Sequence, residues 1–169
     1  MHSTQILVEP EAVEGGGASR DGESAGHPRR WWVLAVLCLS LFLVVVDNTI
    51  VNVALPTLSA DLVASTTQLQ WIVDAYTLVF ASLLLAFGHF GDRFGRRGAL
   101  ALGLVLFGAT SALAAFATSA GALIGVRALM GVGAALVFPA TLAILMNVFT
   151  DKKQRAAAIG IWSGATGMA

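Results

Sequence analysis

The sequence predicts an all-α membrane protein, and two observations support this prediction. Of the 169 residues, 57% are hydrophobic and 12% are charged, whereas an average soluble domain has roughly 25% charged residues. The hydrophobic residues are also gathered into long blocks, and about 20 apolar residues of helix are enough to cross a bilayer core of about 30 Å. The net charge is zero, so nothing indicates a nucleic-acid partner. The lipid bilayer is the expected surrounding.

Four apolar blocks are long enough to span a membrane, and a fifth begins but does not reach full length. We expect these spans at about residues 31–58, 70–87, 98–117 and 121–148, with an incomplete fifth at 156–169. The connections between them are short, which predicts antiparallel neighbours. Residues 1–28 contain several acids and a run of glycines but few large apolar side chains, and are predicted to form a disordered tail. A signal peptide over residues 29–60 is the competing interpretation, but the run is long and ends without a small-residue cleavage site.

The distribution of basic residues predicts how the spans are oriented. Of the 10 Lys and Arg residues, all except Arg127 precede the first span or fall in the second and fourth connections. Lys and Arg accumulate in cytoplasmic segments of membrane proteins. The sequence therefore predicts a multi-pass protein of the plasma or inner membrane, with the N-terminus and the tail in the cytoplasm.

Three ionisable residues lie inside the predicted spans: Asp47, Asp74 and Arg127. Such residues are costly in hydrocarbon and usually face a polar pathway. Counted from the outer ends of their spans they lie roughly 16, 6 and 9 Å deep, so Arg127 can reach either aspartate if the helices are neighbours. One aspartate is then left without a charge partner, and such a carboxylate is suited to bind a proton or a cation. The alternative is a structural Asp–Arg pair with the other aspartate wetted at the interface.

The second connection has the most specific local pattern, Gly88-His89-Phe90-Gly91-Asp92-Arg93-Phe94-Gly95-Arg96-Arg97. Asp and Gly favour the first and fourth positions of a type I turn, which predicts a turn over residues 92–95. Elsewhere, Gly121/Gly125 and Gly160/Gly164 have the GxxxG spacing that allows two helix backbones to approach closely. Incidental glycine in a Gly-rich membrane chain explains these two pairs equally well.

This decamer resembles the loop signature of the major facilitator superfamily, which Gly88, Asp92, Arg93, Gly95, Arg96 and Arg97 match, with Phe90 where Leu is usual. The segment from Asp47 to Pro56 is similar to the first-span signature of the fourteen-span drug:proton antiporter branch. The spacing of Leu123, Arg127, Gly131 and Gly133 resembles the family's fourth-span motif. These similarities cover nearly everything from residue 31 to 160. They imply the N-terminal part of a transporter helical bundle, with four complete spans and a truncated fifth.

The resemblance also implies roles for these residues. The loop residues, Asp92 and its arginines, would latch the two halves of a transporter on the cytoplasmic side. Arg127 would take part in proton coupling, and Asp47 would lie on the path of substrate and protons. The family's fifth-span antiporter motif would fall beyond Ala169.

The expected function is proton-coupled export of hydrophobic, cationic small molecules by the full-length transporter, with Asp47, Arg127 and Asp74 as its coupling and substrate residues. Its partners would be the substrate, protons, the bilayer and the remaining spans. Uptake of a nutrient or metabolite and a non-transporting membrane subunit are the alternatives. An enzyme is not expected, because the sequence has no HExxH, no GxSxG and no metal-ligand cluster. No cofactor or metal is expected either.

Overall fold

The computed structural model describes residues 29–167, apart from the side chains of residues 90, 92 and 94. The predicted tail, residues 1–28, lies outside the described part. Within it the chain forms five α-helices and no strand, which confirms the predicted all-α class. The helices are α1 (Arg29–Asp61), α2 (Thr66–Phe94), α3 (Arg96–Ala114), α4 (Ala120–Val148) and α5 (Lys152–Gly167). The first four are long and apolar enough to cross a membrane.

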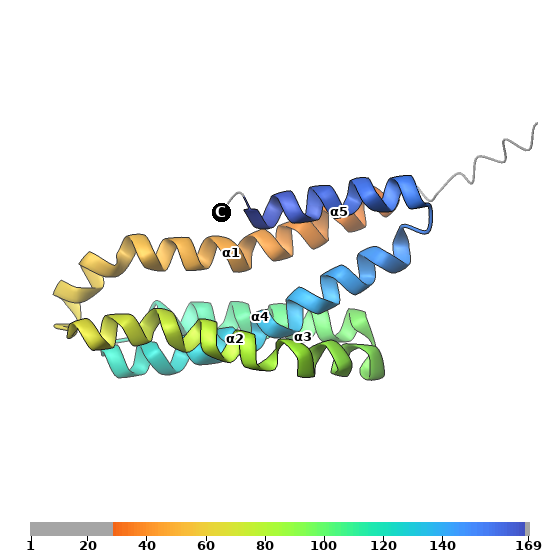
Figure 1. Cartoon of the computed structure of the whole chain (residues 1–169). Helices are drawn as coiled ribbons and strands as arrows, with labels where there is room; N and C mark the ends of the chain where they lie inside the picture. Colours follow the sequence, from red (N-terminus) through yellow and green to blue (C-terminus); the bar gives the residue numbers. More distant parts are fainter. Residues whose placement is uncertain (1–28, 168–169) are drawn as a thin grey trace, which may run out of the picture.

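The helices run up and down in sequence and lie in two layers (Figure 1). In one layer α1 and α5 run side by side, and in the other α2 and α3 lie together. Helix α4 packs against all four of the others. Because successive helices alternate in direction, the basic ends of α1, α2, α3 and α5 lie at the same end of the molecule. We refer to it as the basic end.

Small residues on α4 allow its neighbours to approach closely. A Cβ atom added at Gly131 would lie 2.6 Å from the carbonyl oxygen of Tyr76 on α2. One added at Gly133 would lie 2.9 Å from the backbone nitrogen of Phe107 on α3. Without a hydrophobic force between helices in lipid, such close backbone packing is a main source of association. The two glycines of the fourth-span motif therefore fix α2 and α3 onto α4.

The GxxxG pairs behave differently from these packing glycines. A Cβ added at Gly121, Gly125, Gly160 or Gly164 would meet nothing within 4 Å. In the described part of the chain, neither pair therefore forms a close contact between helices. The spacing alone does not show which face of a helix a glycine lies on, or whether another helix covers that face.

The second helix differs most from the sequence-based expectation. It begins at Thr66 because Ser65 and Gln68 form a capping box, in which the Ser65 hydroxyl accepts the Gln68 N–H and the Gln68 side chain accepts the Ser65 N–H. At the other end α2 continues to Phe94, so the predicted turn over residues 92–95 is wrong. The Gly95 N–H still bonds to the Gly91 carbonyl as in a helix. The chain then changes direction at Gly95 alone, whose φ of 100° is a conformation that other residues rarely adopt.

The helix ends near the basic end are closed by polar side chains. Asp151 accepts the backbone N–H of Gln154 at the start of α5. The Arg155 guanidinium donates to the Phe149 carbonyl at 2.8 Å, directly after α4. Together these contacts satisfy backbone groups that helix ends leave without partners. They also fix the sharp turn that returns the chain from α4 to α5.

Candidate functional site

The guanidinium of Arg127 lies at the centre of a polar cluster within the helical bundle. Arg127 is 1% exposed. The close packing of Gly131, one turn further along α4, against α2 sets the distance between the two helices at this level. A buried arginine needs partners for its donors, because an uncompensated charge away from water costs several kcal/mol. The structure supplies such partners from two other helices.

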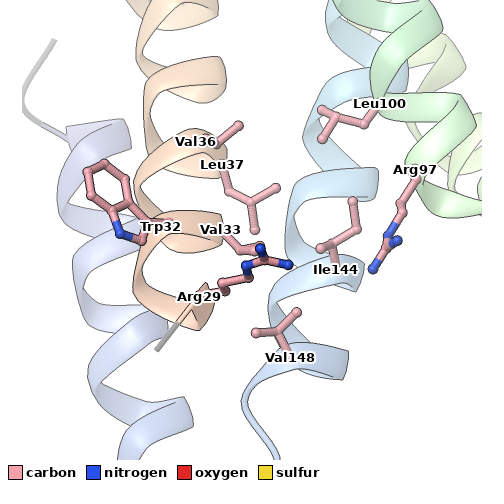
Figure 2. A pocket seen from close by; sticks show the side chains of 9 residues that line it. All are labelled: Arg29, Trp32, Val33, Val36, Leu37, Arg97, Leu100, Ile144 and Val148. Atoms are coloured by element: carbon pink, nitrogen blue, oxygen red, sulfur yellow. The ribbon is translucent and has the colours of Figure 1, made fainter. Parts of the chain in front are cut away.

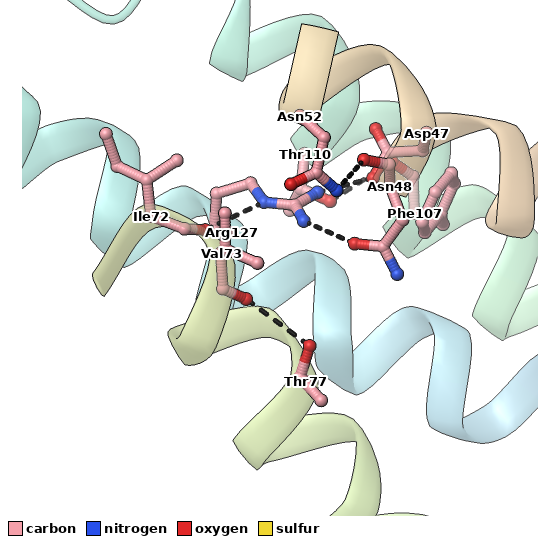
Figure 3. Close-up of polar contacts among 9 residues, drawn as sticks. All are labelled: Asp47, Asn48, Asn52, Ile72, Val73, Thr77, Phe107, Thr110 and Arg127. Carbon is pink, nitrogen blue, oxygen red and sulfur yellow. Dashed lines mark hydrogen bonds and ion pairs between the residues drawn. The ribbon is translucent and has the colours of Figure 1, made fainter. Parts of the chain in front are cut away.

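Each side of the guanidinium has a different partner (Figure 3). The Nε–H donates to the Ile72 carbonyl of α2 at 3.1 Å, Nη2 donates to the Asn48 side-chain oxygen at 2.9 Å, and Nη1 forms an ion pair with the Asp47 carboxylate. The Tyr76 ring lies 4.4 Å from the guanidinium carbon, in cation–π geometry. Arg127 therefore links α4 to both α1 and α2. We call Asp47, Asn48, Ile72, Tyr76 and Arg127 the arginine cluster.

The structure brings two of the three predicted in-span residues together and separates the third. Asp47, with a side chain 16% exposed, pairs with Arg127. Asp74 is exposed on α2, and no ion pair joins it to Arg127 in the described part of the chain. Depth alone left both pairings open. Helix rotation decides between them, because α2 turns Ile72 and Tyr76 toward α4 and so turns Asp74 away.

Three members of the arginine cluster were not predicted from the sequence: Asn48, Ile72 and Tyr76. The signal for Tyr76 was its spacing: Ile72 and Tyr76 are four residues apart and share one face of α2, and both are buried. A buried tyrosine beside an intramembrane arginine is a natural cation–π partner.

A row of aromatic rings continues from the arginine cluster toward the basic end. Tyr76 and Phe80 are stacked with ring centroids 6.2 Å apart, and Phe80 and Phe138 meet edge to face at 5.9 Å. Phe138 meets Trp162 of α5 at 5.2 Å. The Trp162 indole N–H donates to the Thr141 hydroxyl at 3.3 Å. Sequence reasoning gave Trp162 no role, whereas the structure uses it to join α5 to α4.

A cavity of about 300 Å³ opens along this row, between α1, α2, α4 and α5. Its lining combines aromatic and aliphatic side chains with a few uncharged polar groups. We call it the aromatic pocket, and its residues are Val44, Val45, Asn48, Tyr76, Thr77, Phe80, Phe138 and Thr166. Asn48 and Tyr76 belong to both the pocket and the arginine cluster. The pocket is thus in direct contact with the partners of Arg127.

A larger cavity, of about 480 Å³, lies at the basic end between α1, α3 and α4 (Figure 2). Its walls are mostly aliphatic, from residues such as Val33, Leu37 and Ile144, and Arg29 and Arg97 also line it. None of its lining residues belongs to the arginine cluster. Its size therefore does not make it the candidate functional site.

The predicted loop residues lie at the junction of α2 and α3. Gly88, Asp92 and Arg93 are in the last turns of α2, Gly95 makes the reversal, and Arg96 and Arg97 begin α3. Arg96 donates to the Ala143 carbonyl of α4 at 3.1 Å, whereas Arg93 and Arg97 are exposed. The junction is therefore tied to the half of α4 that follows Pro139. Among the side chains that the structure describes, no group of three or more His, Cys, Asp or Glu is placed to hold a metal ion.

Comparison with known proteins agrees with this arrangement. Residues 37–169 match the profile of the Major Facilitator Superfamily. The chain is 50% identical over 135 residues to a multidrug efflux pump (LfrA) of Mycolicibacterium smegmatis, which covers 80% of this chain and 27% of the pump. It is 45% identical over 140 residues to the puromycin resistance protein of Streptomyces alboniger, with 83% of this chain and 28% of the relative covered.

A third relative is the methyl viologen resistance protein SmvA of Salmonella typhimurium, 44% identical over 135 residues, which cover 80% of this chain and 27% of the relative. The chain thus spans little more than a quarter of the length of these three proteins. The matched region contains the arginine cluster, the aromatic pocket and the α2–α3 junction. The chain belongs to the Major Facilitator Superfamily.

Proposed function

We propose that this chain forms the N-terminal part of a proton-coupled transporter that exports hydrophobic, cationic small molecules. The observation on which the proposal rests is the buried ion pair of Arg127 with Asp47, directly beside an aromatic-lined pocket. The relatives support export, since their names describe a multidrug efflux pump and resistance to puromycin and methyl viologen. The complete transporter would need further spans, because transporters of this kind bind substrate between repeated halves.

In this proposal Asp47 is the proton-binding group, and the strength of its contact with Arg127 depends on its charge. With Asp47 ionised, the ion pair holds α1 against α4. Protonation neutralises the carboxylate and leaves the buried guanidinium with only its uncharged partners, which weakens the link between the two helices. Such a change in helix packing is a suitable driver for alternating access. Asp74, exposed on α2, would act separately by attracting cations.

The α2–α3 junction is proposed to latch the cytoplasmic side. The Arg96 bond to the Ala143 carbonyl supports this role, because it couples the junction to the segment of α4 beyond Pro139. Asp92, Arg93 and Arg97 would contact the other half of the transporter. The clustering of basic residues at one end of the bundle supports a cytoplasmic N-terminus in the plasma or inner membrane.

Transport by the complete protein in inside-out membrane vesicles tests the proposal. The vesicle lumen is made acidic, methyl viologen is added outside, and a trapped pH-sensitive dye reports the lumen pH. We expect methyl viologen to accumulate in the lumen while protons leave it. Accumulation that ignores the pH gradient would rule out proton coupling, and substrate movement out of the lumen driven by the same gradient would indicate an importer.

A further inference from the structure

Two consecutive residues of α1 face different cavities. Asp47 lines a space of about 290 Å³ against Leu104, Phe107, Gly108 and Ser111 of α3. Asn48 lines the aromatic pocket instead. Consecutive side chains on a helix project about 100° apart, since there are about 3.6 residues per turn. The carboxylate of Asp47 is therefore not among the lining groups of the pocket.

The pocket is suited to an aromatic cation without a carboxylate. Its lining holds the rings of Tyr76, Phe80 and Phe138 and the uncharged polar groups of Asn48, Thr77 and Thr166. The face of an aromatic ring attracts a cation and stacks against a second aromatic ring. At about 300 Å³ the pocket is at the lower end of the usual range for small-molecule sites, about 300–1,000 Å³. A flat, compact cation fits this lining best.

Arg127 is the only described residue that binds both the proton-site candidate and the pocket wall. It forms an ion pair with Asp47 on one side; on the other it donates to Asn48 at 2.9 Å, and its guanidinium carbon lies 4.4 Å from the centre of the Tyr76 ring. Among the described residues, the charged or titratable groups around Asp47 are Arg127 of α4 and Tyr76 of α2. The α3 and α5 residues that line the two cavities carry no ionisable side chain.

We propose that the aromatic pocket binds the aromatic cation and that Arg127 couples this pocket to Asp47, so that proton and substrate act on one guanidinium from opposite sides. This inference rests on the proposed transport function. A cation that takes the Asn48 oxygen and the Tyr76 ring leaves Arg127 more dependent on the Asp47 carboxylate, which favours the ionised form. When Asp47 is protonated, Arg127 depends on Asn48 and Tyr76 instead, and these two residues are then less available to bind the substrate. By thermodynamic linkage, substrate binding disfavours protonation of Asp47 by the same free energy by which protonation disfavours substrate binding. This opposition is what the exchange of a proton for a substrate requires.

This arrangement differs from direct competition of proton and cation for one carboxylate. Direct competition requires the cation to touch Asp47 and gives Asn48 no part in the pH dependence. Coupling through Arg127 requires Asn48 and places the substrate against Phe80 and Phe138. The two mechanisms therefore predict different results for the same substitutions.

Equilibrium binding to the complete transporter in lipid nanodiscs separates them. The probes are methyl viologen, an aromatic dication, and hexamethonium, an aliphatic dication, each measured by equilibrium dialysis at pH 6 and pH 8. The variants are Phe138→Leu with Phe116→Leu as its matched control, and Asn48→Ala with Asn147→Ala as its matched control. Phe116 and Asn147 are exposed and lie outside the pocket.

We expect wild-type protein to bind methyl viologen more tightly at pH 8. Phe138→Leu should weaken methyl viologen binding about tenfold but leave hexamethonium binding within about twofold, which also shows that the variant is folded. Phe116→Leu should bind both probes like the wild type. In Asn48→Ala, the ratio of the methyl viologen affinities at pH 8 and pH 6 should fall close to one. In Asn147→Ala, this ratio should stay at the wild-type value.

An unchanged pH ratio in Asn48→Ala would overturn coupling through Arg127, and equal effects of Phe138→Leu and Phe116→Leu would overturn the pocket assignment. If wild-type protein binds and transports no cation at all, the proposed function itself fails. That result is distinguishable from the other two because it appears before any substitution is made.

Discussion

Gly131 of α4 lies against the backbone of Tyr76 on α2, so closely that a Cβ at Gly131 would stand 2.6 Å from the Tyr76 carbonyl oxygen. This contact lies one helical turn from Arg127, whose guanidinium meets the Tyr76 ring. The glycine therefore sets the distance between the two helices at the level of the arginine cluster. Substitutions at this glycine should disturb both packing and the cluster.

Gly131→Ala is expected to destabilise the complete transporter by about 1–3 kcal/mol, the usual cost of adding a methyl group to a filled space. Thermal unfolding in detergent measures the change. Gly125→Ala is the matched control on the same helix, where an added Cβ meets nothing within 4 Å, and alanine there should be neutral or stabilising by up to about 1 kcal/mol. Equal midpoints for the two variants would contradict the packing.

Arg127→Lys tests whether the planar guanidinium is needed. A lysine keeps the charge but has one compact ammonium group, which cannot reach Ile72, Asn48 and Asp47 in the geometry of the guanidinium fork. Leaving one buried acceptor without its donor costs about 1–3 kcal/mol, so the unfolding midpoint should fall and coupled transport should be lost. Arg29→Lys, at an exposed position, should change the midpoint little. A fully active Arg127→Lys variant would show that only the charge matters.

Ser65→Ala removes the hydroxyl that caps α2. Loss of such a cap typically costs about 1 kcal/mol, and the first turn of α2 should open more often. Amide hydrogen exchange measures this directly, and we expect faster exchange at the Gln68 N–H. Thr67→Ala, in the same exposed turn, should leave that exchange rate unchanged or slower. If Gln68 exchanges alike in both variants, the capping box does not hold the turn.

The sequence was sufficient to predict the four long helices and their alternating directions. Blocks of apolar residues specify helix length in a membrane, and the clusters of basic residues show which helix ends lie at the same end of the bundle. The sequence did not predict that α2 continues through the 88–94 segment, because a polar, Gly-rich stretch reads as a loop. The reversal depends on one positive φ at Gly95, and the sequence does not show which glycine of the stretch adopts it.

The candidate site was predictable only in part. Depth in the span placed Arg127 within reach of both Asp47 and Asp74. It did not predict which of the two pairs with Arg127, because that depends on how α1 and α2 are rotated about their axes. The rotation of α2 also puts Tyr76 against the guanidinium, and the rotation of α4 and α5 puts the Phe138 ring against Trp162. Spacing within one helix cannot specify contacts between helices that are far apart in sequence.

The most direct test of the account compares Asp47→Asn with Asp74→Asn in the complete transporter. Both changes replace a carboxylate by an amide of nearly the same shape, but only Asp47 pairs with Arg127. The measurement is proton movement driven by methyl viologen in vesicles, normalised to the amount of folded protein. We expect Asp47→Asn to abolish the proton movement and Asp74→Asn to retain most of it. Undiminished proton movement in Asp47→Asn would contradict this expectation.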